Sequence, residues 1–184
     1  GIIGTSLSSD NACLKSRAAA EVILNSGSAC VTTVRVPMVL GEGDYASFAL
    51  ARNARKPFVL AFRADSLEQP IDCQDVITGL LAAARLPPEN RVLELAGPET
   101  LTRRDLIKRA GRILGNEPAV ISIPFSVGAL LAAGLERVSS SPPITRAMLG
   151  VLDHDDEVDT REACELLGIT LTPLVETLNR VVSA

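Results

Sequence analysis

Cys13 and Arg17 are the first pair of side chains in this sequence whose types and spacing could do chemistry. They lie four residues apart in a segment predicted to be helical, so both side chains are expected on one face of the helix. Arg17 can donate hydrogen bonds to hydroxyl groups of a ligand, and Cys13 offers a thiol, a weak donor. The alternative is an ordinary residue pair on a partly exposed helix, without a catalytic role.

A second candidate is the glycine-rich turn at residues 41–46, Gly-Glu-Gly-Asp-Tyr-Ala. It follows one predicted strand and precedes a predicted helix, and Asp65 follows a second strand at about the distance of a ribose-binding acid. Read alone, this pattern predicts a self-contained dinucleotide-binding module. Glu42 and Asp44 argue against it, because they would place two carboxylates beside a pyrophosphate at a helix N-terminus.

A third candidate is the acidic run at residues 153–159, which contains the single histidine of the chain, His154. Clustered carboxylates favour hard cations, but this run lacks the glycine and the spacing of an EF-hand loop. A solvated acidic turn is the favoured interpretation, and no metal site is predicted. No Gly-x-Ser-x-Gly elbow occurs that could belong to a Ser-His-Asp triad.

Four segments, in this order, resemble the C-terminal half of an extended or atypical short-chain dehydrogenase/reductase. The likeness is greatest to the NAD-dependent epimerase/dehydratase group, including members similar to the 39-kDa subunit of respiratory complex I, and it extends over nearly all 184 residues. The segments are residues 13–17 (Cys-Leu-Lys-Ser-Arg) followed by Glu21, 35–44 (Arg-Val-Pro-Met-Val-Leu-Gly-Glu-Gly-Asp), 69–76 (Gln-Pro-Ile-Asp-Cys-Gln-Asp-Val) and 94–101 (Glu-Leu-Ala-Gly-Pro-Glu-Thr-Leu).

The resemblance implies roles for the first pair. In that family a Tyr-x-x-x-Lys pair occupies this helix; the tyrosine acts as general acid or base, and the lysine lowers its pKa and holds the nicotinamide ribose. Here Cys13 stands at the tyrosine position and Arg17 at the lysine position. The family's catalytic Ser or Thr would lie just before Gly1, or at Thr5 or Ser6. Because a thiol is a poor substitute for a phenol, we expect a catalytically degenerate member.

The second segment implies further positions. It resembles Arg-Pro-x-x-Val-Tyr-Gly-Pro-Gly-Asp, in which the backbone after the strand passes the nicotinamide and the turn lines the substrate cleft. The positions expected to meet a cofactor are Pro37, Met38 and Val39, and those expected to line the cleft are Gly41, Gly43 and Asp44. The glycines suit a turn with positive φ at one or more positions. A plain strand-to-helix turn, which needs no ligand, remains the alternative.

The function expected from the resemblance is a nucleotide-binding protein with a structural or regulatory role. The complete protein would bind NAD or NADP through an N-terminal half that these residues do not include, and the 184 residues alone are not expected to bind it. Two alternatives stay open: an active sugar-nucleotide epimerase/dehydratase or NAD(P)-dependent reductase acting on a small-molecule substrate, and the self-contained module at residues 41–46.

The elements that must position these residues alternate between helix and strand, which is typical of a parallel α/β architecture. We expect the second half of a Rossmann-like sheet domain at residues 1–123 and a small, mainly helical lobe at 124–184. Strands are predicted at 30–36, 58–62, 91–96 and 119–123, with a turn at 37–44 and a loop at 139–143. Helices are predicted at 11–26, 45–55, 72–85, 102–114, 125–138, 144–152, 159–167 and from 172 onward. The expected helix caps are Asp10 or Asn11, Asp72 or Asp75, Thr102 paired with Asp105, and Asp159.

Composition limits the partners. The net charge is -4 and no basic cluster is interleaved with aromatic residues, so nucleic acid is not expected to bind. Aromatic residues make up 3% of the chain, which predicts a core of Ala, Leu, Val and Ile. No apolar segment reaches the ~20 residues of a membrane span.

The four cysteines are scattered without a CxxC pair, which favours buried, reduced thiols and a cytoplasmic location. Apolar faces of the predicted helices at 11–26 and 72–85 should be poorly covered. Self-association of these residues in isolation is therefore predicted. The resemblance implies a homodimer, because members of the family often pair through the active-site helix.

Overall fold

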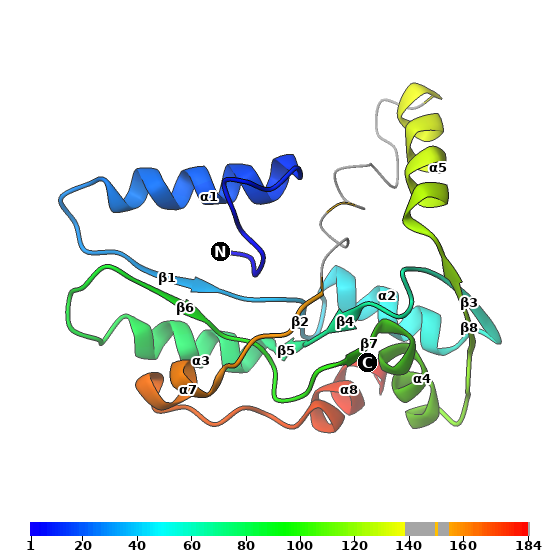
Figure 1. The fold of residues 1–184 in the computed structure, drawn as a ribbon. Helices are drawn as coiled ribbons and strands as arrows, with labels where there is room; N and C mark the ends of the chain where they lie inside the picture. Colours follow the sequence, from blue (N-terminus) through cyan, green and yellow to red (C-terminus); the bar gives the residue numbers. More distant parts are fainter. Residues whose placement is uncertain (139–149, 151–154, 184) are drawn as a thin grey trace.

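A computed structural model describes residues 1–138, 150 and 155–183 of the chain (Figure 1). The helices are α1 (Ala12–Asn25), α2 (Tyr45–Ala54), α3 (Cys73–Ala83), α4 (Arg103–Ile113), α5 (Phe125–Val138), α7 (Arg161–Leu167) and α8 (Leu174–Ser183). The strands are β1 (Thr32–Arg35), β2 (Val39–Leu40), β3 (Phe58–Phe62), β4 (Leu67–Glu68), β5 (Ile71–Asp72), β6 (Arg91–Glu94), β7 (Leu101–Thr102) and β8 (Ala119–Ile123).

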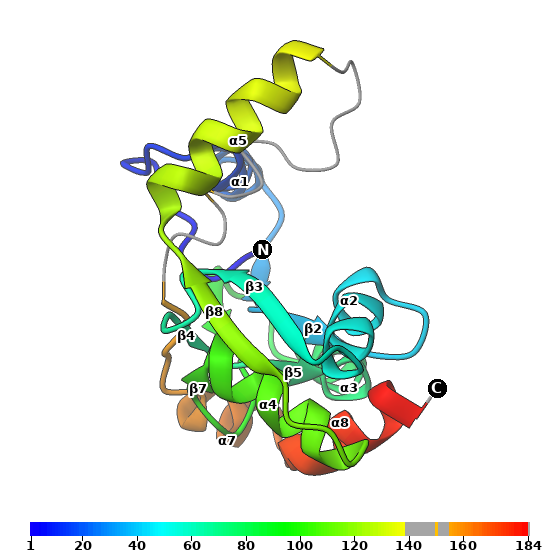
Figure 2. The ribbon, with the colours of Figure 1, turned by 90° about the vertical axis from the view of Figure 1, so that its right-hand side faces the viewer.

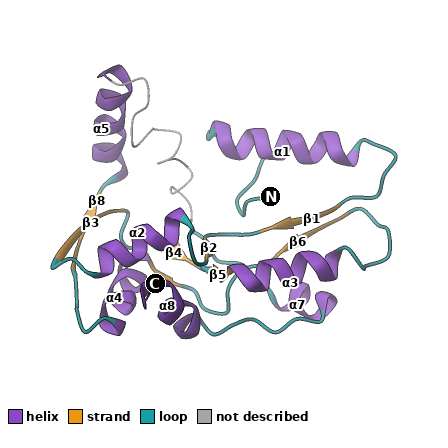
Figure 3. Cartoon of the chain, turned by 180° about the vertical axis from the view of Figure 1, so that it is seen from behind, coloured by secondary structure: helices purple, strands orange, loops and turns teal. Residues whose placement is uncertain are grey.

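The first part of the molecule is a helix–sheet–helix arrangement around β1 and β6. These strands pair in parallel, with Thr32 opposite Arg91 and Arg35 opposite Glu94. The segment at residues 1–3 continues the ladder on the other side of β1, through a parallel bridge between Ile2 and Val36. Figures 1 and 3 show α1 on one side of this ladder and α3 with α7 on the opposite side. Parallel α/β architecture, as expected from the alternating pattern, is confirmed.

The remaining strands form three short ladders. β2 pairs with β5 and β3 pairs with β8, both in parallel, whereas β4 and β7 are antiparallel. In Figure 2, β3 and β8 lie side by side and α5 extends away from the end of β8. The predicted turn at residues 37–44 is wrong in part, because β2 lies within it. Two-residue strands such as β2, β4, β5 and β7 are too short to carry a period-2 pattern.

Side-chain caps explain where several helices begin. Asn11 accepts from the N–H groups of Cys13 and Leu14 at the start of α1, and Asp44 accepts from Ser47 N at the start of α2. The predicted capping pair before α4 is confirmed, because Thr102 Oγ1 accepts from Asp105 N at 3.0 Å and donates to the Asp105 carboxylate at 2.6 Å. Each cap satisfies a backbone N–H that the helix itself leaves without a partner.

One predicted cap is wrong by a residue, and one helix lies outside the described residues. Thr160, not Asp159, occupies the N-cap position of α7, and Asp159 accepts instead from Arg161 N at 3.1 Å. Gly168 ends α7 in the left-handed conformation at φ +63°, as glycine permits. The predicted helix at 144–152 and the predicted loop at 139–143 fall outside the described residues, apart from residue 150.

Two clusters of buried residues form the core, and no aromatic residue is among the buried hydrophobic ones that the structure describes. This confirms the expected Ala, Leu, Val and Ile core for that part of the chain. One cluster joins α2, α4 and α8 to β3 and β8; the other joins β1 and β6 to α3 and α7. Helices from beyond residue 124 thus pack in both clusters, and the division at residue 123 stays a prediction.

Asp72 and Asp75 connect α3 to the C-terminal segment. Asp72 caps α3 by accepting from Gln74 N at 2.8 Å, and it also accepts from Thr177 Oγ1 at 2.9 Å and pairs with Arg180. Asp75, one turn further, accepts from both the N–H and the hydroxyl of Thr172, at 2.7 and 2.8 Å. α8 is therefore held against the start of α3 by side chains as well as by apolar packing.

The outer faces of α1 and α3 are apolar and exposed, as the sequence predicted. The exposed large residues on these two helices are Val22, Ile23 and Leu24 on α1 and Ile77, Leu80 and Leu81 on α3. Within the described ranges, no helix has the length and apolar character needed to cross a membrane. Self-association through the two faces stays a prediction.

Candidate functional site

Cys13 and Arg17 lie in the first two turns of α1. Cys13 is half-buried directly after the Asn11 cap, and Arg17 is exposed one turn further along the helix. No hydrogen bond or ion pair joins the Arg17 guanidinium to the part of the chain that the structure describes. The pair therefore presents a thiol and an available guanidinium from one helix.

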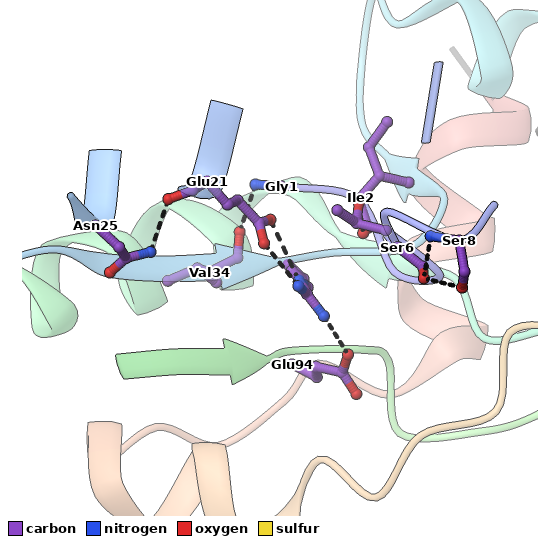
Figure 4. A network of polar contacts seen from close by, with 10 residues as sticks. Gly1, Ile2, Ser6, Ser8, Glu21, Asn25, Val34 and Glu94 are labelled. Carbon is purple, nitrogen blue, oxygen red and sulfur yellow. Dashed lines mark hydrogen bonds and ion pairs between the residues drawn. The ribbon is translucent and has the colours of Figure 1, made fainter. Parts of the chain in front are cut away.

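Thr5 and Ser6, the candidates for a catalytic hydroxyl, follow the strand segment at residues 1–3. Thr5 is buried and its hydroxyl donates to the Ile2 carbonyl oxygen at 2.6 Å. The Ser6 hydroxyl lies 2.8 Å from that of Ser8, within the loop that leads to α1 (Figure 4). Both hydroxyls thus have local partners: Thr5 closes a turn, and Ser6 is the more accessible of the two.

Arg35 links α1 to the β1–β6 ladder. Its guanidinium makes a two-pronged contact with Glu21 of α1, at 3.2 Å from Nε and 2.6 Å from Nη2, and reaches Glu94 of β6 at 3.5 Å. Figure 4 shows Glu21 and Glu94 on opposite sides of this contact. The hydrogen bonds that the Arg35 guanidinium donates to the Glu21 carboxylate raise the pKa of Arg35. This network fixes α1, and with it Cys13 and Arg17, over the ladder.

A cavity of about 450 Å³ opens beside this network. Its walls come from the loop after residue 4, from the inward side of α1 and from Arg35. The lining residues are Thr5, Ser6, Leu7, Ala18, Glu21, Val22, Asn25, Ser26 and Arg35. Cys13 and Arg17 do not line it, so this cavity and the Cys13–Arg17 pair are separate features of α1.

Pro37 and Met38 lie between β1 and β2, Val39 is the first residue of β2, and all three are half-buried. Met38 packs against the cluster around α2, α4 and α8, whereas Val39 packs against the cluster around β1 and α3. The Met38 carbonyl oxygen accepts from Ile71 N at 2.9 Å. The segment therefore bridges the two core clusters, and its packing explains these residues even without a ligand.

Gly41, Gly43 and Asp44 form the turn between β2 and α2. Gly41 N donates to Ser47 Oγ at 2.9 Å, and a Cβ on Gly41 would lie 2.5 Å from Cys73 Sγ, so only glycine fits this close approach to α3. Gly43 has φ +77°, which confirms the positive φ expected for this turn. Asp44 is used as the cap of α2.

Two cavities lie against this turn. One of about 490 Å³ is lined by all three predicted cleft residues together with Tyr45, Phe48 and Arg55. The other, of about 210 Å³, lies between Gly41, Glu42 and the start of α3, beside Arg180. The structure thus brings the predicted cleft residues together at one concave surface, and the carboxylates of Glu42 and Asp44 make that surface unfavourable for a phosphate.

The turn does not belong to a βαβ unit formed by β2, α2 and β3. β2 pairs with β5 and β3 pairs with β8, so the two strands flanking α2 belong to different ladders. Asp65, the proposed ribose-binding acid, forms an exposed ion pair with Arg104, with contacts of 2.8 and 3.1 Å. The hydrogen bond from Arg104 lowers the pKa of Asp65. The dinucleotide fingerprint at residues 41–46 therefore lacks the strand arrangement that it requires.

The acidic, histidine and cysteine side chains were the candidates for metal binding and thiol chemistry. In the described ranges 1–138, 150 and 155–183, no three His, Cys, Asp or Glu side chains gather as a metal site would require. His154 lies outside those ranges. All four cysteines are free, but the expectation that they are buried is wrong: Cys30 is exposed, and Cys13, Cys73 and Cys164 are half-buried.

Sequence reasoning missed the side chains that hold the candidate regions in place. The Glu21–Arg35–Glu94 network and the bonds of Asp72 to Thr177 and Arg180 join residues that are 14 to 108 positions apart. The types of these residues gave a signal, because buried carboxylates and guanidiniums are rarely left without partners. The partners themselves could not be identified from the one-dimensional pattern.

Comparison with known proteins gives likeness in structure only. No protein-family model matches the chain, and no curated protein matches its sequence. A nucleoside-diphosphate-sugar epimerase from Pseudomonas aeruginosa matches 97% of the chain with a TM-score of 0.71 and 23% identity. A UDP-N-acetylglucosamine 4-epimerase from Bacillus cereus (TM-score 0.65, 14% identity) and RMD from Pseudomonas aeruginosa complexed with NADPH (0.63, 14%) each match 92% of it.

The chain spans only about half the length of these proteins, with 56%, 53% and 52% of their residues covered. At identities of 23% or less, the likeness establishes the fold. The α/β class and the Rossmann-like arrangement expected from the sequence are thereby confirmed.

Proposed function

We propose that this chain is the C-terminal part of an NAD(P)-binding protein of the extended or atypical short-chain dehydrogenase type, in which the active site is catalytically degenerate. The observation that carries the proposal is the placement of Cys13 and Arg17 one turn apart at the start of α1, the helix that covers one side of the parallel β1–β6 ladder (Figure 1). The fold shared with sugar-nucleotide epimerases supports it.

The chemistry of the pair favours binding over catalysis. Arg17 is exposed and has no partner among the described residues, so its guanidinium can donate to the hydroxyls of a nicotinamide ribose. The Cys13 thiol is shorter than a phenol and a weaker hydrogen-bond donor, so it cannot occupy the place of a tyrosine hydroxyl above a substrate carbonyl. Pro37, Met38 and Val39 would line the nicotinamide side through their backbone.

The nucleotide would then serve as part of the folded structure. A cofactor that binds only the native state stabilises it by mass action, by about 2.7 kcal/mol at a concentration of 100 times its Kd. A structural or regulatory role, of the kind that the likeness to the complex I 39-kDa group suggests, needs no turnover. The glycine-rich phosphate loop, Gly-x-x-Gly-x-x-Gly, would lie in the half of the protein encoded before residue 1.

The test is a fluorescence titration of the full-length protein with NADH and NADPH. We expect binding, and we expect Arg17→Ala to weaken it by at least ~10-fold, since a charge-assisted hydrogen bond contributes roughly 1.5–3 kcal/mol. Arg161→Ala, at an exposed position of α7, is the matched control and should leave the Kd unchanged. Equal Kd values for wild type and Arg17→Ala would contradict the role of Arg17.

An active epimerase, dehydratase or reductase is the second candidate, favoured by the likeness to a UDP-N-acetylglucosamine 4-epimerase. The same protein, incubated with UDP-sugars and NAD(P), separates the two. Our proposal predicts no turnover in the wild type. Turnover that occurs with Cys13 in place and is abolished by Arg17→Ala would establish the enzyme and reject the degenerate site.

A further inference from the structure

The cavity of about 490 Å³ along α2 is lined by two aromatic side chains that lie largely in solvent. Tyr45 is 75% exposed and Phe48 is 65% exposed. They are three residues apart, so they lie on one side of α2, whereas the other side of the helix packs in the core cluster. The chain has one tyrosine, four phenylalanines and no tryptophan, and two of these rings lie at this one concave surface. Aromatic rings in such a cavity are typical of a ligand-binding site.

Glu42 and Asp44 line the same cavity, and only one of the two carboxylates is used by the fold. Asp44 caps α2 by accepting from Ser47 N at 3.1 Å, and its charge offsets the positive end of the helix dipole. Glu42 is exposed, and no hydrogen bond or ion pair joins its carboxylate to the residues that the structure describes. Glu42 therefore leaves a negative charge beside the aromatic rings.

The positive charge that also lines the cavity lies at its other end. Arg55 follows α2, eleven residues after Asp44, which is roughly 16 Å away at 1.5 Å per helical residue. Its guanidinium donates to the Val182 carbonyl oxygen at 2.9 Å, so it is held by α8. The two rings and the free carboxylate thus share one end of the cavity without a cation of the chain between them.

We propose that this end of the cavity binds a small organic ammonium ion, with its positive charge between the Glu42 carboxylate and the rings of Tyr45 and Phe48. An alkylated ammonium is attracted by the faces of aromatic rings and fills apolar space at the same time. Because Gly41 and Gly43 of the predicted substrate cleft line this cavity, the inference names a ligand class for that cleft and in this respect rests on the proposed function.

Three other ligand classes fit the cavity less well. A phosphate would meet the carboxylates of Glu42 and Asp44. A hard metal ion prefers six or more oxygen ligands, and one of these two carboxylates is already a helix cap. A neutral apolar molecule would take water from the Glu42 charge without replacing its interactions. An ammonium group satisfies the carboxylate and the rings together.

Isothermal titration of the full-length protein with choline and with 3,3-dimethylbutan-1-ol tests the charge. The alcohol has the shape of choline but a neutral carbon in place of the ammonium nitrogen. We expect choline to bind at least ~10-fold more tightly than the alcohol. Equal affinities, or no choline binding at concentrations up to about 10 mM, would overturn the proposal. Tighter binding of inorganic phosphate than of choline would overturn it as well.

Matched variants locate the ligand in this cavity. Glu42→Gln keeps the shape of the side chain and should raise the Kd of choline by ~5-fold, and Phe48→Leu should do the same by removing one ring. Glu157→Gln removes an exposed carboxylate outside the cavity and should leave the Kd unchanged. An unchanged Kd in Glu42→Gln or in Phe48→Leu, or an equal loss in Glu157→Gln, would overturn the site.

The choline titration contains no nucleotide, so its outcome is separate from that of the NADH and NADPH titration. Choline binding that depends on Glu42 in a protein that binds neither nucleotide would support the ammonium site and reject the proposed function. Nucleotide binding without choline binding would overturn the ammonium site and leave the proposed function standing.

Discussion

Asp72 and Arg180 form an ion pair that joins the end of β5, directly before α3, to α8. The Asp72 side chain is buried, with 3% exposure, and the other bonds of its carboxylate go to Gln74 N and Thr177 Oγ1. One carboxylate thus caps α3 and holds α8, so its loss should affect both core clusters.

The variant Asp72→Ala should lower the free energy of unfolding by about 3 kcal/mol, because it removes a helix cap and leaves the buried Thr177 hydroxyl without its acceptor. Urea unfolding followed by circular dichroism measures this, since the chain has no tryptophan. Asp105→Ala, which removes an exposed partner in the capping pair before α4, is the comparison and should cost about 1 kcal/mol or less. Equal losses in the two variants would contradict the special role of Asp72.

Gly97 should tolerate no side chain. A Cβ there would lie 1.9 Å from the Pro70 carbonyl oxygen, a backbone atom that cannot rotate away. We expect Gly97→Ala to lower stability by about 3 kcal/mol. Gly134→Ala is the control: nothing lies within 4 Å of its Cβ, and alanine in α5 should raise stability by about 0.5–1 kcal/mol. Thermal unfolding should therefore give a lower melting temperature for Gly97→Ala and a higher one for Gly134→Ala than for the wild type.

Asp159 should titrate well below a free aspartate. Hydrogen bonds from the Arg161 side chain and backbone lower its pKa to about 2. Because the folded-state pKa is lowered from 3.8, the contribution of this pair to stability is present above pH 3.8 and is lost as the pH falls toward 2. An NMR titration of the Asp159 carboxylate should give a midpoint near the lowered pKa of about 2 in the wild type. In Arg161→Ala the midpoint should return toward 3.8.

Cys30 should be the first thiol to react. It is exposed, whereas Cys13, Cys73 and Cys164 are half-buried. Labelling with a water-soluble disulfide reagent should therefore show one fast thiol and three slower ones, since access of the reagent to the sulfur limits the rate. Cys30→Ser should remove the fast phase. A fast phase that survives this change would place the most accessible thiol elsewhere, with Cys13 as the first position to test.

Local sequence signals were sufficient for most of the longer elements. The strand at residues 58–62 and the helix at 125–138 have the predicted bounds, and Asn11 and Thr102 begin their helices as caps should. These features depend on residues within one or two turns of each other. β2 was missed, because a two-residue strand is defined by its partner and carries no pattern of its own.

For the candidate site, the sequence could assign positions but not neighbours. Gly41, Gly43 and Asp44 do share one concave surface, and Gly43 has the expected positive φ. That Gly41 lies against Cys73 follows from the pairing of β2 with β5, which the chain decides over a separation of about 30 residues. The roles assigned to Cys13 and Arg17 come from a resemblance, so they await the titration and the turnover assay.

The position of α8 has a practical consequence for anyone expressing parts of this protein. Val182 of this helix is fully buried, and its carbonyl oxygen accepts a hydrogen bond from Arg55 at 2.9 Å. The last turn of α8 is therefore part of the core. A truncation after residue 173 would remove the α8 residues from the core cluster that also contains α2 and α4. An affinity tag attached to α8 without a spacer would disturb the same cluster.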